Sequence, residues 1–437
     1  MRIVEVMREV LQLDGHAFIA ELYRELLCRE PDPGGHQHHV DLLAAGMPKL
    51  EMVARLLRSP ESMERNGFEE LPPPTELYRS TLDWVDTLHL PPSGINASYK
   101  SFDCGQEGLR SQPKGEDVSF KWKFEMTRQT SMPPPQFVAV IPGGRVIGEK
   151  GAVISPDNKL LWDVSIDFDK GGFDHSIFSE IRTPPVRYTS ETVAVLTSSA
   201  SYNYYHWTFD VLTRIELLRR TGIPIDKYAI SRRGGDFSFQ DETLAIMGIP
   251  KEKLIKCDAR THLRAETLVV PSMAGYTGHM PKQLCQALRE RIVLDRGLQP
   301  VNEFKRIFIS RSRAPRRKML NEPDVFRLLQ NYGFRSVELE GLTVTEQARI
   351  FLSAEIIVSP HGAGLANLVY CTPGTKLLEI FSPKYVHPCY WILSEQAGLD
   401  YYYLMGDGES SIHNFGNEDI VVNMRGLSGT LAMMGLH

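Results

Sequence analysis

Cysteine is scarce in this sequence, and no two cysteines form a Cys-x-x-Cys pair. Closely spaced thiols are the mark of structural zinc sites and redox dithiols, and dense cysteines mark small disulfide-stapled secreted domains. The spacing argues against all three classes and predicts reduced thiols. The six cysteines are Cys28, Cys104, Cys257, Cys285, Cys371 and Cys389.

Long apolar runs and an excess of positive charge are also missing. No segment approaches the roughly 20 apolar residues that a membrane-spanning helix needs, and residues 1–16 intersperse charged with apolar side chains. The formal net charge of -5 argues against a nucleic-acid partner bound through a basic surface. We therefore expect a cytoplasmic protein without a nucleic-acid partner, with peripheral attachment to the inner membrane as the alternative.

Breakers and apolar spacing divide the chain into segments. Residues 1–68 show amphipathic helical spacing, which predicts a small all-α module. Residues 69–136 are rich in proline and weakly periodic, which predicts a linker and an irregular lead-in. From residue 137 onward, β-branched runs alternate with helical patterns, as in α/β proteins with parallel sheets. We expect Rossmann-like domains at 137–299 and 300–395, and a segment 396–437 that packs back across the domains.

A glycine-rich turn follows the apolar run at residues 356–358. It reads His361-Gly362-Ala363-Gly364 and continues through Leu365 into a helical pattern. Glycine allows positive φ and close approach of a ligand, and the N–H groups that begin a helix attract anions. We interpret the turn as a diphosphate site. A tight strand–helix turn without a ligand is the alternative.

Two further segments of the same domain carry candidates for this site. Glu379 ends an apolar run, where its carboxylate could accept hydrogen bonds from ribose hydroxyls or simply face solvent. Arg311 ends another strand, and Arg316 and Arg317 follow in its loop; guanidinium groups suit phosphate oxygens. Ligands of open α/β sheets lie beyond the carboxyl ends of the strands, so Arg311, His361 and Glu379 are expected to converge.

The preceding domain offers a candidate base. His206 and Asp210 stand four residues apart, hence on one helical face, where Asp210 can orient the imidazole. Such a pair could deprotonate an acceptor hydroxyl; a buried structural histidine is the alternative. We expect Asn203, Tyr205 and Trp207 on the acceptor side of the site. The aromatic rings suit stacking on a sugar, and a place in the core is the alternative for them.

Two patterns suggest a metal, and neither is strong. Residues 36–39 read His-Gln-His-His, without a carboxylate or cysteine at ligand spacing. Asp167 and Asp169 form an Asp-x-Asp triplet in a glycine-rich stretch far from the phosphate turn. We therefore expect no metal site.

The ordered set of segments resembles glycosyltransferase family 61. The similar text is NYYHWTFD, FISR with RRKMLNE, EQARIFLSAEIIVSPHGAGLANLVYCTPG, LLEIF and YYYL, along about residues 185–405. The resemblance implies a GT-B fold, an inverting reaction and no obligatory metal. It places Arg311, the HGAGL turn and Glu379 on the nucleotide side, with His206 and Asp210 on the acceptor side. Residues 1–68 resemble a helical module of unknown function.

We therefore expect an inverting transferase that uses a nucleotide sugar, UDP-linked, and a glycan or glycolipid acceptor in bacterial surface-polysaccharide synthesis. The donor is a substrate, and no cofactor is expected. A sugar-nucleotide epimerase or hydrolase, or a non-enzymatic carbohydrate-binding protein, are the alternatives. Residues 1–68 are candidates for contact with a membrane surface or a protein, and oligomerisation stays open.

Overall fold

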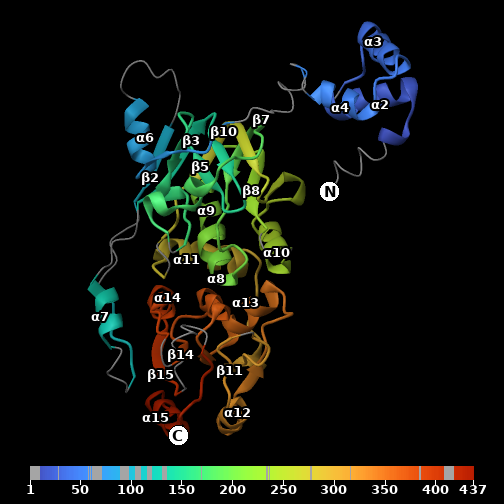
Figure 1. The fold of residues 1–437 in the computed structure, drawn as a ribbon. Coiled ribbons are helices and arrows are strands. Elements are labelled where there is room, and N and C mark those ends of the chain that lie inside the picture. Colours follow the sequence, from blue (N-terminus) through green and yellow to red (C-terminus); the bar gives the residue numbers. More distant parts are fainter. Residues whose placement is uncertain are drawn as a thin grey trace.

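The computed structural model of the chain contains two β-sheets arranged one above the other, with helices between them (Figure 1). It describes residues 10–27, 29–57, 59, 61, 71–88, 98–103, 110–115, 121–129, 135–168, 170–232, 235, 237–275, 278–314, 316–382, 385–407 and 418–437. Cys28, Cys104 and Asp169 lie outside these residues. The four described cysteines, Cys257, Cys285, Cys371 and Cys389, are buried.

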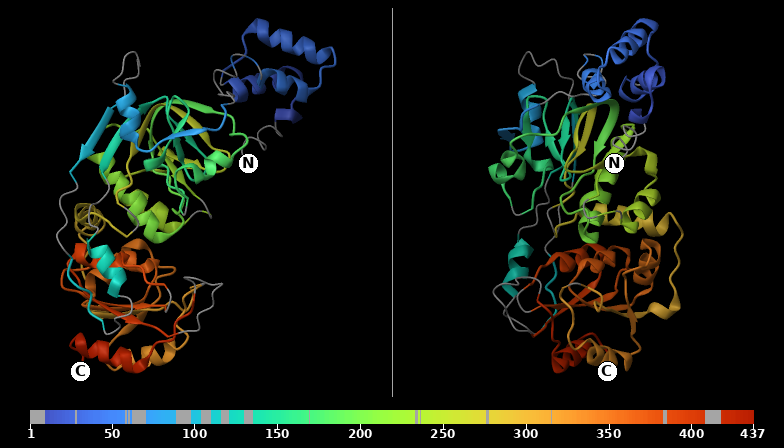
Figure 2. Two further views of the ribbon diagram at one scale, coloured as in Figure 1. Left: turned by 60° about the vertical axis from the view of Figure 1, so that its left-hand side comes forward. Right: turned by 45° about the vertical axis from the view of Figure 1, so that its right-hand side comes forward.

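Three helices form where the N-terminal part of the chain shows helical spacing: α2 (Gly15–Leu27), α3 (Pro33–Ala44) and α4 (Lys49–Leu57). They pack around Phe18, Leu22 and Met52, which are fully buried. Asp32 caps α3 by accepting a hydrogen bond from the Gly35 N–H at 2.8 Å. These helices stand apart from both sheets in Figures 1 and 2.

The first sheet is mixed rather than parallel. β7, β8, β9 and β10 run parallel, but β3, β4, β5 and β6 pair antiparallel. A parallel crossover needs a dozen or more residues, whereas β4 and β5 are joined by a short turn with Gly148 and Gly151 at φ 72° and 74°. The parallel expectation for this domain is therefore wrong for half of the sheet. The order is β1 (Glu76–Tyr78), β6 (Lys159–Leu161), β5 (Ala152–Ile154), β4 (Arg145–Ile147), β10 (His262–Pro271), β7 (Arg187–Val195), β8 (Lys227–Ser231) and β9 (Leu254–Cys257); β3 (Gln136–Pro142) pairs with β10 and with β2 (Ser98–Phe102).

The second sheet is parallel throughout and has the order β12 (Arg335–Val337), β11 (Arg306–Ile309), β13 (Ile356–Pro360), β14 (Lys376–Phe381) and β15 (Asp400–Met405). The chain order reverses between β11 and β13. In doubly wound sheets the crevice beyond the carboxyl ends of the strands at such a reversal is where ligands bind. Its helices are α12 (Glu322–Gln330), α13 (Val344–Ser353), the 3₁₀ helix η8 (Ala363–Tyr370), α14 (Cys389–Ala397) and α15 (Met424–Met433).

The part of the chain that forms the first sheet and the part that forms the second are here called the first and second halves. Helices from both halves share one apolar core where the sheets face each other. Leu284 and Ile292 from the first half lie in one cluster with Phe351, Leu368 and Trp391 from the second, and all five are buried. Tyr204 Oη also donates to Asn367 Oδ1 across the boundary at 2.7 Å. The two halves are therefore packed against each other. The helices and helical turns of the first half are α8 (Tyr204–His206), η4 (Trp207–Leu212), α9 (Thr213–Arg219), α10 (Ser238–Ile246), α11 (Lys282–Arg289), η6 (Glu290–Leu294), η1 (Trp162–Val164), η2 (Gly172–Asp174), η3 (Ser176–Ser179) and η5 (Lys251–Lys253). The 3₁₀ turn η7 (Asn302–Phe304) precedes β11 and lies against α13.

The segment 69–136 is not an irregular lead-in. It supplies β1, α6 (Thr81–Leu88) and β2 to the first sheet, and then α7 (Lys121–Gln129) beside the second (Figure 1). Phe124 of α7 is buried against Trp391 and Tyr403, and Lys114 bonds the backbone of Tyr401 and Tyr403. The chain returns to the first sheet through β3. Isolated anchors of this kind have no periodicity, so the sequence pattern does not reveal them.

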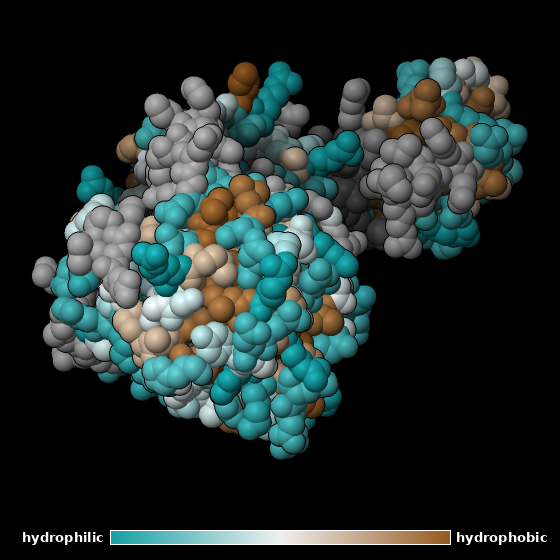
Figure 3. Space-filling view, turned by 90° about the horizontal axis from the view of Figure 1, so that it is seen from below, coloured by the Kyte–Doolittle hydropathy of each residue, from teal (hydrophilic) through white to brown (hydrophobic). Residues whose placement is uncertain are grey.

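The C-terminal segment belongs to the second sheet. β15 is its fifth strand, so this domain extends beyond residue 395. Leu427 and Leu431 of α15 are buried against Phe308 and Leu378. The described part of 396–437 therefore packs on one sheet, and the prediction that it crosses both domains is wrong. Figure 3 shows this end of the molecule, with a band of hydrophobic residues among hydrophilic ones.

Candidate active site

A cavity opens where the first turn of α8 meets the carboxyl ends of β13 and β14. His206 lines it from the first half of the chain, and His361 lines it from the second. Gly362 lines both this cavity and an adjoining hollow beside Arg311. The cavity is lined by Asn203, Tyr205, His206, Arg317, His361, Gly362, Ala363, Tyr385, His387, Cys389 and Tyr390.

His206 and Asp210 form the pair that their spacing predicts. His206 Nδ1 lies 2.7 Å from Asp210 Oδ2, Asp210 is buried and His206 is partly exposed. A carboxylate that accepts from Nδ1–H leaves Nε2 as the acceptor nitrogen. Below this pair, the buried guanidinium of Arg214 donates to the carbonyls of Thr197 and Pro271, and burial lowers the pKa of Arg214 to about 10. Asp210 therefore fixes the orientation of the His206 ring.

The helix that carries this pair is irregular. Residues 207–212 form a π-helical segment between α8 and α9. Thr208 Oγ1 and Thr213 Oγ1 donate to the carbonyls of Tyr204 and Phe209, which are four residues earlier. Single π turns inside helices are frequent at functional sites. The helical stretch after Asn203 is thus divided into α8, this segment and α9 (Thr213–Arg219).

Glu379 does not stand where a ribose contact requires. Its side chain has 0% exposure, Oε1 bonds His361 Nδ1 at 2.5 Å, and Oε2 accepts from Tyr401 Oη at 2.6 Å. Burial raises the pKa of Glu379 to about 8. Both expectations from the sequence, ribose contact and solvent exposure, are therefore contradicted. Glu379 instead holds His361 from behind, and stacking on Phe381 holds the ring as well.

The glycines of the turn serve close packing rather than positive φ. Gly362 has φ -178°, which is extended backbone, and Gly364 is not among the positive-φ glycines. A Cβ on Gly362 would lie 2.0 Å from Arg311 Nη1, and one on Gly364 would lie 2.6 Å from Leu339 Cδ1. Ala363 and the buried Leu365 then begin the 3₁₀ helix η8. The turn is thus shaped to admit the Arg311 guanidinium.

The three arginines occupy different positions. Arg311 Nη2 donates to the Arg316 carbonyl at 2.9 Å, and burial lowers the pKa of Arg311. Arg317 has φ 54° and lies over the Tyr385 ring at 5.1 Å from its centroid, facing the cavity. The side chain of Arg316 is exposed and does not line the cavity. Arg311 and Arg317 therefore converge with His361, whereas Arg316 contributes its carbonyl.

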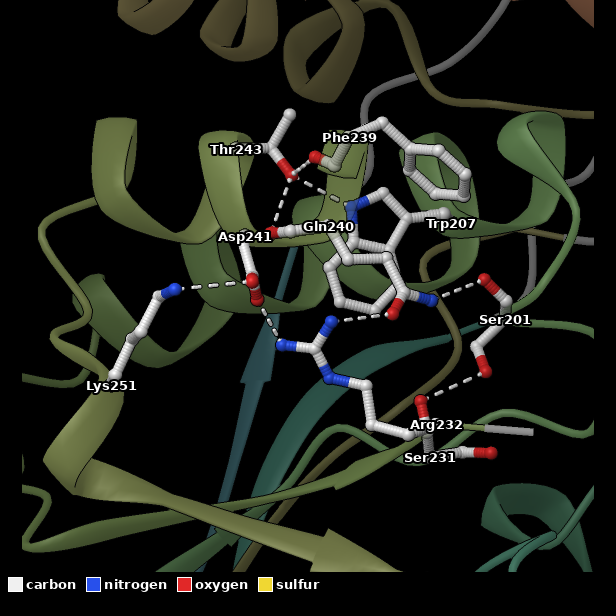
Figure 4. Close-up of polar contacts among 9 residues, drawn as sticks. All are labelled: Ser201, Trp207, Ser231, Arg232, Phe239, Gln240, Asp241, Thr243 and Lys251. Atoms are coloured by element: carbon white, nitrogen blue, oxygen red, sulfur yellow. Dashed lines mark hydrogen bonds and ion pairs between the residues drawn. The ribbon is translucent and has the colours of Figure 1, made fainter. Parts of the chain in front are cut away.

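Trp207 is part of the core rather than of the acceptor side. It has 0% exposure, and its Nε1 donates to Thr243 Oγ1 at 2.8 Å (Figure 4). The same close-up shows Gln240 bridging Arg232 and the carbonyl of Ser201. The expectation for Trp207 is contradicted. Asn203 and Tyr205 do line the cavity: Asn203 caps α8 through the Tyr205 N–H, and Tyr205 Oη accepts from Gly278 N–H at 3.0 Å.

Four residues that line the cavity were not predicted from the sequence. Tyr385, His387, Cys389 and Tyr390 precede or begin α14. His387 Nδ1 accepts from Cys389 N–H at 3.3 Å, and burial lowers the pKa of His387 to about 4, so the ring is neutral. The segment Tyr-Val-His-Pro-Cys-Tyr-Trp concentrates aromatic and polar residues just after the Glu379 strand. Its position directly after the carboxyl end of a parallel strand could have identified it as part of a ligand site.

The two patterns weighed as metal sites have other partners. Asp167 Oδ1 accepts from Lys150 Nζ at 2.8 Å, and bonds from Lys150 and Ser176 lower the pKa of Asp167 to about 2. His39 bonds Tyr23 Oη and the Gly35 carbonyl. Within the described parts of the chain, no cluster of three His, Cys, Asp or Glu side chains is arranged to hold a metal ion. Nor has any described helix the length and apolar character to cross a membrane.

Comparison with known proteins finds a family model that matches a large part of this site. Residues 204–378 match the family model for glycosyltransferase 61, and residues 8–66 match a domain of unknown function, DUF4214. A segment of 61 residues is 39% identical to a beta-1,2-xylosyltransferase of Oryza sativa subsp. japonica and covers 14% of this chain. A segment of 98 residues is 29% identical to a beta-1,2-xylosyltransferase of Arabidopsis thaliana and covers 20% of this chain. These matches span only 11% and 18% of the two relatives. The chain thus contains a glycosyltransferase 61 domain, the family that the ordered motifs resemble, and this domain includes His206, Arg317 and His361 of the cavity.

Proposed function

We propose that the protein is an inverting glycosyltransferase that moves a sugar from a UDP-linked donor to a glycan hydroxyl, in the synthesis of a bacterial surface polysaccharide. One observation carries the proposal. A carboxylate-held histidine, His206, shares a cavity with the glycine turn and Arg317 at the reversal point of a parallel sheet. We further propose that the two packed halves form a GT-B pair, with the donor on the second sheet.

The proposed chemistry is a single displacement at the anomeric carbon. His206 Nε2 takes the proton of the acceptor hydroxyl while that oxygen bonds the anomeric carbon. The bond from this carbon to the phosphate oxygen breaks, and the nucleoside diphosphate leaves with the electron pair. The transition state has oxocarbenium character, as in glycosidic cleavage. Attack from the side opposite the leaving group inverts the configuration.

The leaving diphosphate needs positive charge and hydrogen-bond donors. Arg317 faces the cavity, and Arg311 lies against Gly362 at its rim. Preorganised donors of this kind stabilise charge that develops in the transition state. They supply the charge that a divalent ion would otherwise supply, so we propose that no metal is obligatory. Phe168 packs against His206 at 4.8 Å between ring centroids, and offers an apolar surface to the acceptor sugar.

A nucleotide-release assay tests the proposal. The donor panel begins with UDP-xylose, because the matched relatives are named as beta-1,2-xylosyltransferases, and includes UDP-linked hexoses and N-acetylhexosamines. Release that depends on a glycan acceptor, with inverted anomeric configuration by NMR, supports it. Donor conversion without acceptor would instead indicate an epimerase or hydrolase, and glycan binding without release would indicate a binding protein. Activity that disappears with EDTA and returns with Mg²⁺ or Mn²⁺ would overturn the metal-free mechanism.

A further inference from the structure

The ring of His361 is held by two buried polar side chains, Glu379 and Tyr401, which take no part in the proposed displacement. Its Nδ1 lies 2.5 Å from Glu379 Oε1, and Tyr401 Oη donates to Glu379 Oε2 at 2.6 Å. Glu379 is fully buried, and Tyr401 and His361 are nearly so. Burying a carboxyl group is costly unless its hydrogen bonds are satisfied. The contacts with His361 and Tyr401 satisfy the buried carboxyl group of Glu379.

These hydrogen bonds control which nitrogen of His361 carries the proton. A neutral imidazole has one N–H, so Nδ1 and Nε2 take opposite roles. If Glu379 is protonated and its hydroxyl donates to Nδ1, Nε2 is a donor. If Glu379 is ionised, it accepts from Nδ1–H, and Nε2 becomes an acceptor. Because Glu379 occupies Nδ1, Nε2 is the ring nitrogen left to meet a ligand in the cavity.

The surroundings favour the first arrangement at neutral pH. Burial raises the pKa of Glu379 to about 8, opposed by the Tyr401 hydrogen bond and by Arg317. Burial, and then Arg317 and Arg311, lower the pKa of His361 well below its usual value. Glu379 is thus the group that holds the proton. The titratable groups that face this pair are Arg311, Arg317, Tyr385, His387, Cys389, Tyr390 and Tyr401.

We propose that Glu379 is a positioning residue that keeps His361 as an Nε2–H donor to a diphosphate oxygen of the donor substrate, and that Tyr401 orients the carboxyl group of Glu379 by donating to Oε2. This inference rests on the proposed function for its ligand. It assigns opposite tasks to two histidines in one cavity. Asp210 holds His206 as a proton acceptor, whereas Glu379 holds His361 as a hydrogen-bond donor. Environments that push paired groups toward opposite roles are typical of acid–base sites.

The first test needs no substrate. In ¹⁵N-histidine-labelled full-length protein, with His361→Gln to assign the signal, the ring nitrogens report the tautomer. Nε2–H is expected at pH 7, with conversion toward Nδ1–H as the pH rises through about 8. Glu379→Gln is expected to keep Nε2–H throughout, because the amide donates to Nδ1 while its oxygen accepts from Tyr401. An Nδ1–H tautomer at pH 7 in the wild type would overturn the inference.

The second test follows UDP binding by calorimetry between pH 7 and 9.5. For the wild type, the Kd is expected to rise toward about tenfold per pH unit above pH 8, the limit for loss of one proton. Glu379→Gln is expected to abolish this rise. Tyr401→Phe is expected to move it to higher pH, because the Tyr401 hydroxyl stabilises the ionised Glu379. A merely structural role would weaken binding equally at every pH.

The matched control is Tyr402→Phe. Tyr402 is a buried tyrosine on the same strand, and it packs in the apolar cluster of Phe308 and Leu378 rather than beside Glu379. It is expected to leave the pH profile of UDP binding unchanged. Identical profiles for wild type, Glu379→Gln and Tyr401→Phe would overturn the inference even if UDP binds. A protein that binds UDP at no pH would overturn the proposed donor, while the tautomer measurement would still decide the role of Glu379.

Discussion

His206 and His361 stand 155 positions apart in the chain, and they line one cavity with each Nδ1 held by a buried carboxylate. Asp210 reaches His206 from the same helix, whereas Glu379 reaches His361 from the neighbouring strand. The first contact is local and the second is tertiary. That difference decides which parts of the site the sequence reveals.

Replacing His206 by alanine is expected to lower kcat by about 10²–10⁴, the usual contribution of a positioned general base. UDP affinity should be unchanged, since His206 serves the acceptor. Asp210→Asn should lower kcat as well, because the amide no longer selects the tautomer. Asp295→Asn, which breaks a surface pair with Arg291, is the control. Full transfer activity in His206→Ala would remove this residue from the mechanism.

Gly362→Ala should weaken UDP binding. A Cβ here would lie 2.0 Å from Arg311 Nη1, so the guanidinium must move away from the turn. The side chain of an arginine can shift, and the loss of folding stability should be the smaller effect. Gly171→Ala is the matched control, because a Cβ there meets nothing within 4 Å and φ is -111°. Equal UDP affinity in the two variants would show that Arg311 is not needed at the turn.

Trp207→Phe should lower the free energy of unfolding by about 1–3 kcal/mol, because it removes the bond to Thr243 Oγ1 and leaves a gap in the core. The acceptor KM should stay the same. Urea unfolding and acceptor titrations measure the two effects. His206→Ala should show the reverse pattern, with activity lost and stability kept. A raised acceptor KM in Trp207→Phe would restore Trp207 to the acceptor side.

Stability should depend on pH through Glu379. Its pKa rises from 4.5 unfolded to about 8 in the fold, so the folded state binds the extra proton between these values. Stability relative to Glu379→Gln is therefore expected to fall as the pH rises from about 4.5 to 8, and then to level off. Chemical unfolding of both proteins at pH 5, 6.5 and 8.5 measures the difference. A difference that grows in the opposite direction would contradict the burial of a protonated Glu379.

Phe124→Ala should release α7 from the second sheet. The ring is buried against Trp391 and Tyr403, and removing a buried phenylalanine typically costs about 3–5 kcal/mol. Hydrogen exchange should rise over residues 121–129. Trp122→Ala, on the same helix with 56% exposure, is the control and should change little. Equal exchange in both variants would show that Phe124 does not anchor the helix.

Strong local patterns predicted the main α/β elements. The alternation after residue 300 predicted a parallel sheet, and its strand ends placed Arg311 and His361 together, because parallel strands end at one edge. The four-residue spacing predicted the His206–Asp210 contact. The antiparallel half of the first sheet was not predicted, because the residue pattern of a short strand does not distinguish parallel from antiparallel pairing. The packing of segment 69–136 on both sheets was not predicted, because single buried residues such as Phe124 produce no periodic pattern in the sequence.

The sequence by itself determined the motifs, their order and the contacts made within one helix or one strand-to-helix turn. Only the tertiary structure decided that Glu379 faces His361 and Tyr401 rather than a ribose, and that Trp207 lies in the core. The physical reason is that a side chain's partner depends on which strand or helix lies next to it. The sequence pattern shows which side of a helix or strand is apolar, and only the packing of the elements determines which residues contact that side.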